Sequence, residues 1–495
     1  MKQKLFLVLG DQLFKSNSQL IGYDVVMVES RDSCSRFNYH KQKLAFVLGC
    51  MREHRDFLSW AGLNVNYTEI GKQKSFEEVL GVLCSEYDEI EFYDISDKGF
   101  GKLINQLASQ LFKKVTVREN PQFLTTKVEF ADYIATKNKR LLMNDFYIYQ
   151  RKRLKLLLDI DGNPIGGAWN YDADNRSKLP KNVTVPKVYQ PKPTQNYLEA
   201  REVVLEFYPN NPGLVDKLWL PTNHEQAELL LQDFLNNRLE SFGDYEDSLS
   251  DRDPFLFHSI LSPVINNGLL TPDYVLHRLF EHCESNPSLI KEHLNSVEGF
   301  VRQIIGWREW IKGLYDTKYS EDLGQYNFFN AKNNLTKDFY FEKQSQPTNE
   351  FFAHDLTYNQ PLQLALDKVQ KYGYNHHIER LMVLGNWMLL NEFEPIQCYN
   401  WFMEMYVDAY EWVMVPNVLG MALFADGGVF ATKPYVAGGN YLKKMSDYKI
   451  TKEVEELWTN KFWDFLLKHK TVFKSNPRMA MLITAKENKL SGKTK

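Results

Sequence analysis

Short β-rich segments alternate with amphipathic helical segments over the first 120 residues of this 495-residue chain. Residues 41–62 and 75–87 carry apolar side chains at helical spacing. Apolar strands that alternate with helices indicate a parallel sheet covered on both faces. The N-terminal part is therefore expected to be an α/β domain. Its predicted strands cover residues 4–10, 25–30, 64–70, 89–95 and 114–120.

A different pattern follows the α/β part. The segment 160–195 holds five prolines, which disfavours regular helices and strands. It also contains "GGAWNYDADNR", whose many polar groups favour an ordered loop over a flexible tether. From residue 196 onward the periodicity is helical almost throughout. The expected division is an α/β domain over 1–135, a connector over 136–195 and an all-α domain over 196–495.

The composition sets limits on function. The net charge of −4 gives no overall attraction to nucleic acid, so a DNA-binding role would need a local basic surface. The start "MKQKLFLVLGDQLF" does not read as a signal peptide, and no apolar run has the length of a membrane span. A cytoplasmic protein without a membrane partner is expected. G-x-G-x-x-G and phosphate-loop motifs are absent from the sequence, which disfavours dinucleotide chemistry in the α/β part.

Two adjacent histidines precede an apolar stretch in "NHHIERLMVLGNW", residues 375–387. Successive residues of a helix point about 100° apart, so His376 and His377 cannot face the same partner. On a helix, His377 shares a stripe with Leu381 and Leu384, which is the spacing of a buried face. From this stretch alone, one histidine would be solvated and the other would be a hydrogen-bonded core residue.

Eight motifs in order give a more specific prediction. They are "LGDQL", "GGAWNYDADNR", "HSILSPVINNGLL", "EGFVRQIIGWREWIKGLYD", "YNHHIERLMVLGNW", "MYVDAYEW", "PNVLGMALFADGGVFATKPYVAGGNYLKKMSDY" and "KSNPRMA". Together they resemble the cryptochrome/photolyase family. Within it the match is to the prokaryotic (6-4) photolyases, known as the iron–sulfur bacterial cryptochromes and photolyases. The resemblance extends from residue 9 to about residue 480.

The resemblance implies the photolyase fold, a Rossmann-like N-terminal domain followed by a large helical FAD-binding domain. It implies a monomeric flavoprotein that uses light to repair (6-4) photoproducts in UV-damaged DNA, which makes it a carbon–carbon lyase. Two alternatives stay open: a blue-light photoreceptor of cryptochrome type that repairs nothing, and a photolyase for cyclobutane pyrimidine dimers. A third, a flavin-free DNA-binding scaffold, would require the flavin motifs to be accidental.

The flavin site follows from the same resemblance. His258 stands where the family has a threonine, and Met414 stands near flavin N5, where this branch often has a polar side chain. Arg380 and Asp408 are expected to hold the isoalloxazine edge and each other. The expected FAD-binding residues are His258, Ser259, Leu261, Ser262, Gln303, Trp307, Arg308, Arg380, Asn386, Asp408, Tyr410 and Met414.

The family's catalytic histidine corresponds to His377, which would handle the proton transfer of repair. An imidazole suits this role because its ordinary pKa lies near neutrality. His376 would be its neighbour toward solvent or DNA, and Tyr435 and Tyr441 would flank the lesion. Trp401 and, with weaker support, Trp412 would carry electrons to the flavin. Lys433, Lys443 and Lys444 are expected to contact DNA.

The chain also departs from its branch. The five cysteines, Cys34, Cys50, Cys84, Cys283 and Cys398, occupy none of the four expected cluster positions, so no iron–sulfur cluster is expected. Gly10, Asp11 and Gln12 match an antenna site for 6,7-dimethyl-8-ribityllumazine. However, Ser33 replaces a glutamate there, so an empty crevice is the alternative. Asp172, Asp174 and Asp253 could bind a divalent ion or could simply cap loops.

Overall fold

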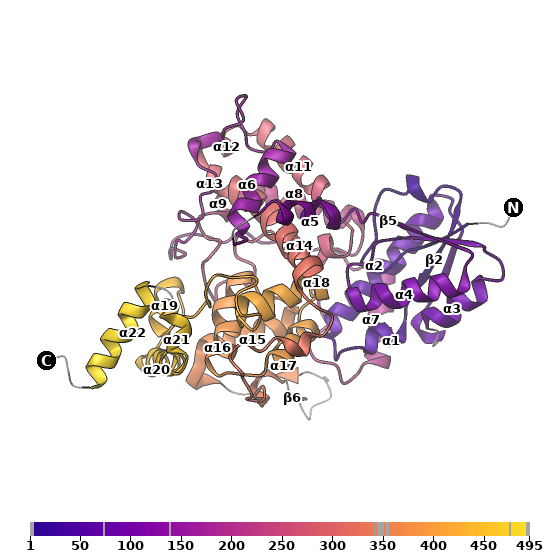
Figure 1. The fold of residues 1–495 in the computed structure, drawn as a ribbon. Coiled ribbons are helices and arrows are strands. Elements are labelled where there is room, and N and C mark those ends of the chain that lie inside the picture. The colour runs from indigo at the N-terminus through magenta and orange to yellow at the C-terminus, as the bar shows by residue number, and fades with distance from the viewer. Residues whose placement is uncertain are drawn as a thin grey trace.

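A five-stranded parallel sheet forms the N-terminal part of the computed structural model (Figure 1). The structure describes residues 4–491, except 73–74, 138–139, 341, 344–350, 353–355 and 475–476. The strand order is β3-β2-β1-β4-β5. All five predicted strands are confirmed, to within about two residues at their starts. They are β1 (Lys4–Leu7), β2 (Tyr23–Val28), β3 (Val65–Thr68), β4 (Glu89–Tyr93) and β5 (Lys114–Arg118).

Side chains of β1 alternate between two cores, as expected for a sheet covered on both faces. Leu5 and Leu7 belong to the core that includes Ile104 of helix α4 (Lys98–Leu111). Phe6 belongs to the opposite core, which includes Leu48 of helix α2 (Lys41–Trp60). Each of these side chains is 0% or 1% exposed. The predicted continuous apolar strands are therefore explained by burial on both faces.

In the sheet, β2 and β3 lie on one side of β1, whereas β4 and β5 lie on the other side. The strand order therefore reverses between β1 and β4. Such a switch point leaves a crevice at the carboxyl ends of the two strands. Residues 8–12 and 94–97 follow β1 and β4 at this edge.

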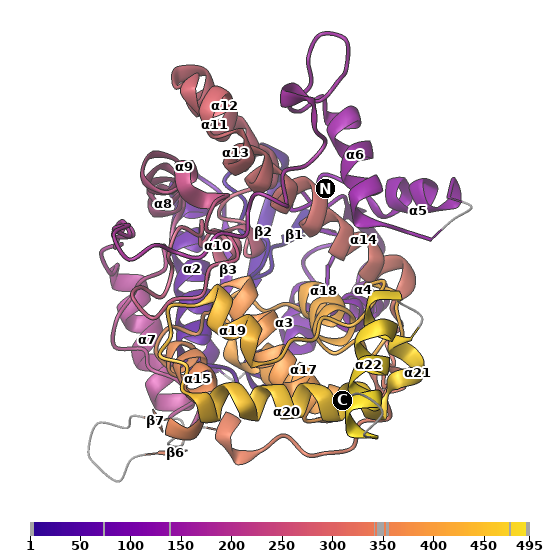
Figure 2. The ribbon, with the colours of Figure 1, turned by 90° about the vertical axis from the view of Figure 1, so that its left-hand side faces the viewer.

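Helices make up most of the remainder (Figures 1 and 2). The other α-helices are α1 (Arg31–Ser35), α3 (Phe76–Leu83), α5 (Lys127–Ala135), α6 (Met143–Leu154), α7 (Gln195–Phe207), α8 (His224–Asn237), α9 (Leu239–Phe242), α10 (Ser262–Asn266), α11 (Pro272–Ser285), α12 (Ser288–Glu292), α13 (Leu294–Val301), α14 (Glu309–Lys318), α15 (Gln360–Tyr372), α16 (Asn386–Leu390), α17 (Pro395–Met405), α18 (Glu411–Met414), α19 (Gly439–Met445), α20 (Lys452–Lys468), α21 (Lys470–Phe473) and α22 (Pro477–Leu490). Short 3₁₀ turns are η1 (Ser18–Leu20), η2 (Ile70–Lys72), η3 (Ile165–Gly167), η5 (Leu323–Gln325), η6 (Lys337–Phe339) and η7 (Thr357–Asn359). A two-stranded antiparallel ladder of β6 (Glu342–Lys343) and β7 (Phe351–Phe352) interrupts the helical part.

Among the residues that the structure describes, three segments of π-helix interrupt the helical part: η4 (Arg302–Arg308), η8 (Glu379–Gly385) and η9 (Val415–Ala422). A π-helix has wider turns than an α-helix, and such segments occur frequently at functional sites. The three segments lie on different parts of the chain, yet η4 packs on α14, which contacts η9, and η9 contacts η8. They surround one region of the helical part.

The 160–194 part of the connector is an ordered loop, as the sequence indicated, whereas residues 143–154 of the connector form helix α6. Arg151 at the end of α6 donates to the carbonyl of Trp169 over 2.8 Å, and the amide of Tyr171 donates to Glu298 over 2.9 Å. Asn175 is 2% exposed. Among the described residues, no helix is both long enough and apolar enough to cross a bilayer.

Candidate cofactor and substrate pocket

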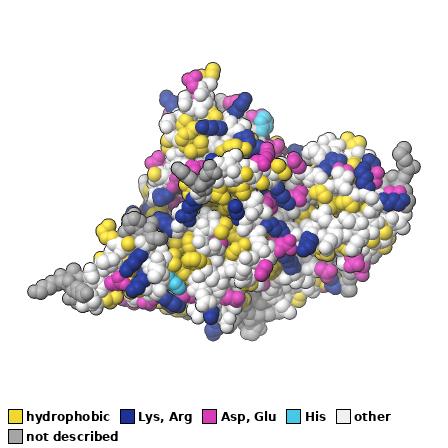
Figure 3. Space-filling model, viewed as in Figure 1, with side chains coloured by type: hydrophobic (Ala, Val, Ile, Leu, Met, Phe, Trp, Pro, Cys, Tyr) yellow, Lys and Arg dark blue, Asp and Glu magenta, His cyan; other side chains and the backbone are white. Residues whose placement is uncertain are grey.

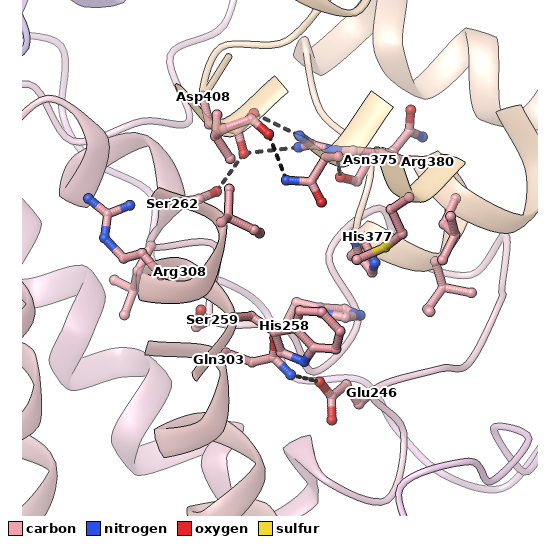
Figure 4. Close-up of a pocket in the computed structure, with 18 of the residues that line it drawn as sticks. Glu246, His258, Ser259, Ser262, Gln303, Arg308, Asn375, His377, Arg380 and Asp408 are labelled. Carbon is pink, nitrogen blue, oxygen red and sulfur yellow. Dashed lines mark hydrogen bonds and ion pairs between the residues drawn. The ribbon is translucent and has the colours of Figure 1, made fainter. Parts of the chain in front are cut away.

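A cavity of about 450 Å³ lies where the three π-helical segments meet (Figure 4). Its size falls within the range of small-molecule sites, about 300–1,000 Å³. Many predicted site residues line this cavity, including FAD-binding residues, the catalytic histidine, one electron carrier and one residue expected to flank the lesion. They are His258, Ser259, Leu261, Ser262, Gln303, Trp307, Arg308, His377, Arg380, Asp408, Trp412, Met414 and Tyr435.

Arg380 and Asp408 form a two-pronged ion pair in this wall. Arg380 Nη1 donates to Asp408 Oδ1 over 2.9 Å, and Nη2 donates to Oδ2 over 3.0 Å. The guanidinium also lies 4.0 Å from the ring centre of Tyr406, and its Nε donates to the carbonyl of Asn375 over 2.7 Å. The expected contact between Arg380 and Asp408 is therefore present, and the guanidinium is fixed from several sides.

Two residues of α10 hold Asp408 from the opposite side. Ser262 Oγ donates to Asp408 Oδ2 over 2.6 Å, and Asn266 Nδ2 donates to the Asp408 carbonyl over 2.9 Å. Asp408 itself is 5% exposed. Ser262 and Arg380 together donate three hydrogen bonds to the Asp408 carboxylate, and Asn266 fixes the backbone beside it. Arg380 therefore keeps a matched countercharge beside the cavity.

Arg308 provides a second buried cation. Its Nη1 donates to Asn266 Oδ1 over 2.5 Å, and its guanidinium lies 4.6 Å from the ring centre of Trp412. Burial lowers the pKa of Arg308 to about 10, with Glu309 acting against this shift. The group remains positive at neutral pH, so it could attract an anionic ligand.

The structure corrects the prediction for His376. The expectation was a side chain toward solvent or DNA, but His376 is 1% exposed. Its ring stacks on the ring of His258, with centroids 4.6 Å apart and planes inclined by 11°. Helical spacing failed here because α15 ends at Tyr372 and is capped by Gly373, which has a left-handed φ of 59°, and the next helix begins only at His377.

His377 is exposed into the pocket, although helical spacing had placed it on a buried stripe. Desolvation by the surrounding pocket and the charge of Arg380 lower its pKa to about 4. The imidazole is neutral at pH 7 and therefore offers one N–H donor and one acceptor nitrogen. His377 is positioned to contact a ligand, while His376 supports the wall behind it.

Glu246 is a pocket residue that the sequence reasoning missed. It lies in the turn after α9, and its carboxylate accepts a hydrogen bond from Gln303 Nε2. Asn175 Nδ2 donates to the other oxygen over 3.2 Å. Burial raises the pKa of Glu246 to about 7, while Arg302 acts in the opposite direction. No local sequence pattern marks Glu246, because its partners come from the connector and from η4.

Besides His376, four residues predicted to bind the cofactor, flank the lesion or carry electrons do not line the cavity. Asn386 is 1% exposed, donates to the Ala437 carbonyl over 2.9 Å and accepts from the Ala437 amide over 3.2 Å. Tyr410 faces the N-terminal domain, where Lys43 Nζ lies 5.8 Å from its ring centre. Tyr441 lies outside the wall, and so does Trp401. For Asn386 the role visible in the structure is to hold the segment that carries Tyr435.

The two candidate electron carriers differ in position. Trp412 lies in the pocket wall, 1% exposed, in edge contact with Phe123 at 5.0 Å between ring centres. Trp401 is also 1% exposed, and its ring centre is 5.9 Å from that of Tyr406, which in turn contacts Arg380. Aromatic contacts therefore connect Trp401 to the pocket, although Trp401 itself does not reach the protein surface.

The predicted antenna residues Gly10, Asp11 and Gln12 lie at the carboxyl end of β1, facing the helical domain. The Asp11 carbonyl accepts from Gln122 Nε2, which also donates to the Asn266 carbonyl over 2.8 Å. Gln12 Nε2 donates to the Asp94 carbonyl over 3.0 Å. Burial, with a smaller effect from Asp97, raises the pKa of Asp11 to about 7.

The three aspartates proposed for a divalent ion do not converge. Asp253 accepts from the backbone amides of Phe255 and Leu256, which makes it a loop cap. Asp172 pairs with Arg302 over 3.1 Å, and Asp174 is exposed. In the part of the chain that the structure describes, no three acidic, histidine or cysteine side chains are grouped to bind a metal. The loop-capping alternative is thus correct for Asp253.

The predicted DNA-contacting lysines lie near α19 and are exposed. Lys443 is already paired with Glu455 over 2.8 Å, which reduces its availability for phosphate. On the face seen in Figure 3, Lys and Arg side chains alternate with Asp and Glu. This face therefore carries no broad basic surface among the residues drawn in colour.

The pocket residues fit a flavin dinucleotide by their chemistry. The cavity combines an apolar wall of Leu261, Trp307 and Met414 with the buried cation Arg308. Arg308 Nε and His258 Nε2 are buried and have no hydrogen-bond partner among the described residues. Buried polar groups normally have partners, so these two nitrogens indicate that a ligand with polar groups belongs here.

Comparisons with solved structures identify the fold. A bacterial class III photolyase from Agrobacterium tumefaciens shares the fold with a TM-score of 0.55 and 16% identity, covering 96% of this chain and 89% of the other. A cryptochrome of Synechocystis gives a TM-score of 0.55 with 12% identity, covering 94% of this chain and 89% of the other. The chain thus has the photolyase fold.

Sequence comparisons define the family. The model of the deoxyribodipyrimidine photo-lyase-related protein family matches residues 6–220. A (6-4) photolyase of Agrobacterium fabrum is 32% identical over 499 aligned residues, which cover 96% of this chain and 94% of the relative. The chain belongs to the cryptochrome/photolyase family, which confirms the resemblance drawn from its motifs.

Proposed function

We propose that this protein is a light-driven DNA-repair flavoprotein, a (6-4) photolyase that reverts pyrimidine (6-4) pyrimidone photoproducts. The observation that carries the proposal is His377, exposed into the cavity that also contains the Arg380–Asp408 pair. The 32% identity to the (6-4) photolyase of Agrobacterium fabrum over 96% of the chain supports this lesion class.

FAD is the proposed cofactor. Arg380 and Asp408 would hold the isoalloxazine edge, and Arg308 with the 258–262 segment would face the diphosphate. Trp307, Met414 and Leu261 would pack against its flat rings. Bound in reduced form and excited by light, FAD would supply the electron that starts repair. Trp412 in the wall and Trp401 beyond Tyr406 are the proposed carriers for reducing it.

His377 would hold the proton that repair requires on one of its imidazole nitrogens. In the free protein its lowered pKa keeps the ring neutral, because Arg380 and desolvation disfavour the imidazolium. A bound DNA strand would bring negative phosphates, which favour the charged form and raise this pKa toward neutrality. Substrate binding would therefore make His377 a competent acid.

The lesion would be flipped out of the duplex into the pocket, at a cost of a few kcal/mol. Tyr435 lies in the pocket wall, and we propose that it and Tyr441 flank the flipped bases. Lys433 and Lys444 are the proposed phosphate contacts because both are exposed beside this segment. Lys443 would first have to leave Glu455.

The other predicted properties also belong to this proposal. The protein would be a cytoplasmic monomer without an iron–sulfur cluster, divided at about residues 135 and 195. The crevice at Gly10, Asp11 and Gln12 would hold 6,7-dimethyl-8-ribityllumazine. Support comes from the strand switch point and from the half-buried carboxylate of Asp11, whose raised pKa of about 7 lets it act as donor or acceptor.

Repair under blue light tests the function. The reduced protein would be assayed separately on oligonucleotides with one (6-4) photoproduct and with one cyclobutane dimer, with dark samples as controls. We expect light-dependent loss of the (6-4) lesion only. Repair of the cyclobutane dimer alone would reassign the substrate, and flavin binding without repair of either lesion would favour a photoreceptor.

A further inference from the structure

We propose that Glu246 is a positioning residue that holds the carboxamide of Gln303 with its oxygen toward the pocket. The wall then accepts a hydrogen bond from an N–H group on a flat heterocycle. This inference rests on the proposed function, which supplies two such heterocycles: the cofactor and a flipped pyrimidine base.

The direction of the Gln303 amide follows from its partner. Gln303 Nε2 donates to Glu246 Oε1 (Figure 4). An ionised carboxylate has only acceptor sites, so the NH₂ group must face it and the amide oxygen must face away. Arg302 Nη2, 3.9 Å from Glu246 Oε2, favours the ionised form. Gln303 and Glu246 both line the cavity, so the free amide oxygen is available to a ligand there.

A chain of amides fixes the same polarity from the other side of Glu246. Asn175 Nδ2 donates to Glu246 Oε2 over 3.2 Å, and Asn175 Oδ1 accepts from Asn295 Nδ2 over 3.4 Å. Asn295 Nδ2 also donates to Asp244 Oδ1 over 2.8 Å. A carboxylate, which only accepts hydrogen bonds when ionised, stands at each end of this chain. If any one amide were turned over, a donor would face a donor or an acceptor would face an acceptor. The orientation is therefore set by several residues together.

Packing holds the assembly in place. Asn175 is 2% exposed and Arg302 is 3% exposed. Gly299 lies against Asn175 and Glu246, and a Cβ at position 299 would come within 2.7 Å of Asn175 Nδ2. Glycine at 299 is thus what allows Asn175 to reach Glu246. These contacts leave Glu246 little freedom to turn away from Gln303.

The protonation of Glu246 would control this arrangement. Burial is the main cause that raises its pKa to about 7, and Asp247 and Asp172 add to it, while Arg302 and Asn175 oppose it. Below this pKa the protonated carboxyl can itself donate to the Gln303 oxygen. The NH₂ group could then turn to the pocket, so a ligand N–H would lose its acceptor as the pH falls.

Glu246→Gln tests the proposal, with Glu240→Gln as the matched control. Glu240 is exposed and pairs only with His293 among the described ion pairs, at 3.3 Å. We would measure the Kd of FAD for each variant. We would then measure the Kd of (6-4)-containing and undamaged oligonucleotides for FAD-loaded protein, from pH 6 to pH 9. Loss of one oriented hydrogen bond should weaken binding about 3- to 10-fold in Glu246→Gln, and Glu240→Gln should match wild type.

Two readouts separate positioning from a general structural role. The wild-type affinity should fall between pH 8 and pH 6, and this fall should be absent in Glu246→Gln. In the double variant Glu246→Gln/Gln303→Glu, the new amide can donate to the new carboxylate, which still presents an acceptor oxygen to the pocket. Its affinity should return to within about 3-fold of wild type.

The two ligand sources are distinguished by which affinity changes. A weaker Kd for FAD assigns the N–H group to the cofactor, whereas a weaker Kd for the lesion with unchanged FAD binding assigns it to the flipped base. Unchanged affinities and an unchanged pH profile in Glu246→Gln would overturn this inference alone. Wild-type protein that binds no FAD would overturn the proposed function, and this inference with it.

Discussion

The ring of His258 lies flat against the ring of His376, with centroids 4.6 Å apart. Behind this pair, Glu379 is 0% exposed and accepts from Lys368 Nζ over 2.6 Å. His376 Nε2 lies 3.6 Å from the same carboxylate. His376 therefore packs behind the pocket wall, and only His377 of the two adjacent histidines is exposed to a ligand.

The first prediction separates these two histidines. His377→Ala should keep FAD bound but lower (6-4) repair by about 10²–10⁴-fold, because a positioned acid–base group is lost. His376→Ala should mainly lower the free energy of unfolding, since it removes a buried ring between His258 and Glu379. The measurements are the repair yield per absorbed photon and the free energy of unfolding in urea, each for both variants. A His377→Ala variant that repairs at the wild-type rate would contradict the proton-transfer role.

The second prediction concerns Asp408→Asn. The change keeps the shape but leaves Arg380 buried without its countercharge, which typically costs about 3–5 kcal/mol. The variant should lose FAD during purification and unfold at a lower temperature. Absorbance of bound flavin and calorimetry measure both effects. Glu487→Gln, which removes the surface pairs with Lys470 and Lys474, is the control and should change neither.

The third prediction uses the pH dependence of stability at His40. Its Nδ1 accepts from the Gln42 amide over 3.0 Å, and its Nε2 donates to the Gln370 carbonyl over 2.9 Å. Burial lowers the folded-state pKa to about 4. The unfolded chain, with the ordinary pKa, therefore binds more protons between about pH 6.5 and pH 4, and stability is lost as the pH falls through this window.

The non-titrating variant His40→Gln isolates this effect. Between pH 7.5 and pH 5, wild type should lose about 2 kcal/mol more unfolding free energy than the variant. Urea unfolding at the two pH values gives the difference. Equal losses in the two proteins would mean that His40 is not held neutral in the folded state.

The fourth prediction is that protein purified anaerobically contains no stoichiometric iron. Cys34, Cys50, Cys84, Cys283 and Cys398 are the whole cysteine set, and the positions where the branch has its ligands hold other residues. Iron–sulfur clusters need thiolate ligands. Elemental analysis and the visible spectrum test this, and a cluster absorption with matching iron would show that the ligands were misassigned.

The sequence alone determined the parts that depend on local pattern. Five apolar segments became five parallel strands because burial on both faces requires continuous apolar residues. Eight motifs that stand in the expected order along the chain were enough to recognise the family. Arg380 and Asp408 could be paired in advance because both stand in such motifs, although only the structure gives their contacts.

Tertiary structure decided what depends on contacts between distant segments. Glu246 lies 57 residues before Gln303 and 71 after Asn175, so no local pattern could join them. Helical spacing predicted that His377 would be buried, but the structure has His377 exposed and His376 buried. The prediction was wrong because Gly373 follows the end of one helix just before the two histidines. Asn386 and Tyr410 carry motif matches but face away from the cavity. A motif fixes which residue is present, whereas packing fixes the direction in which its side chain points.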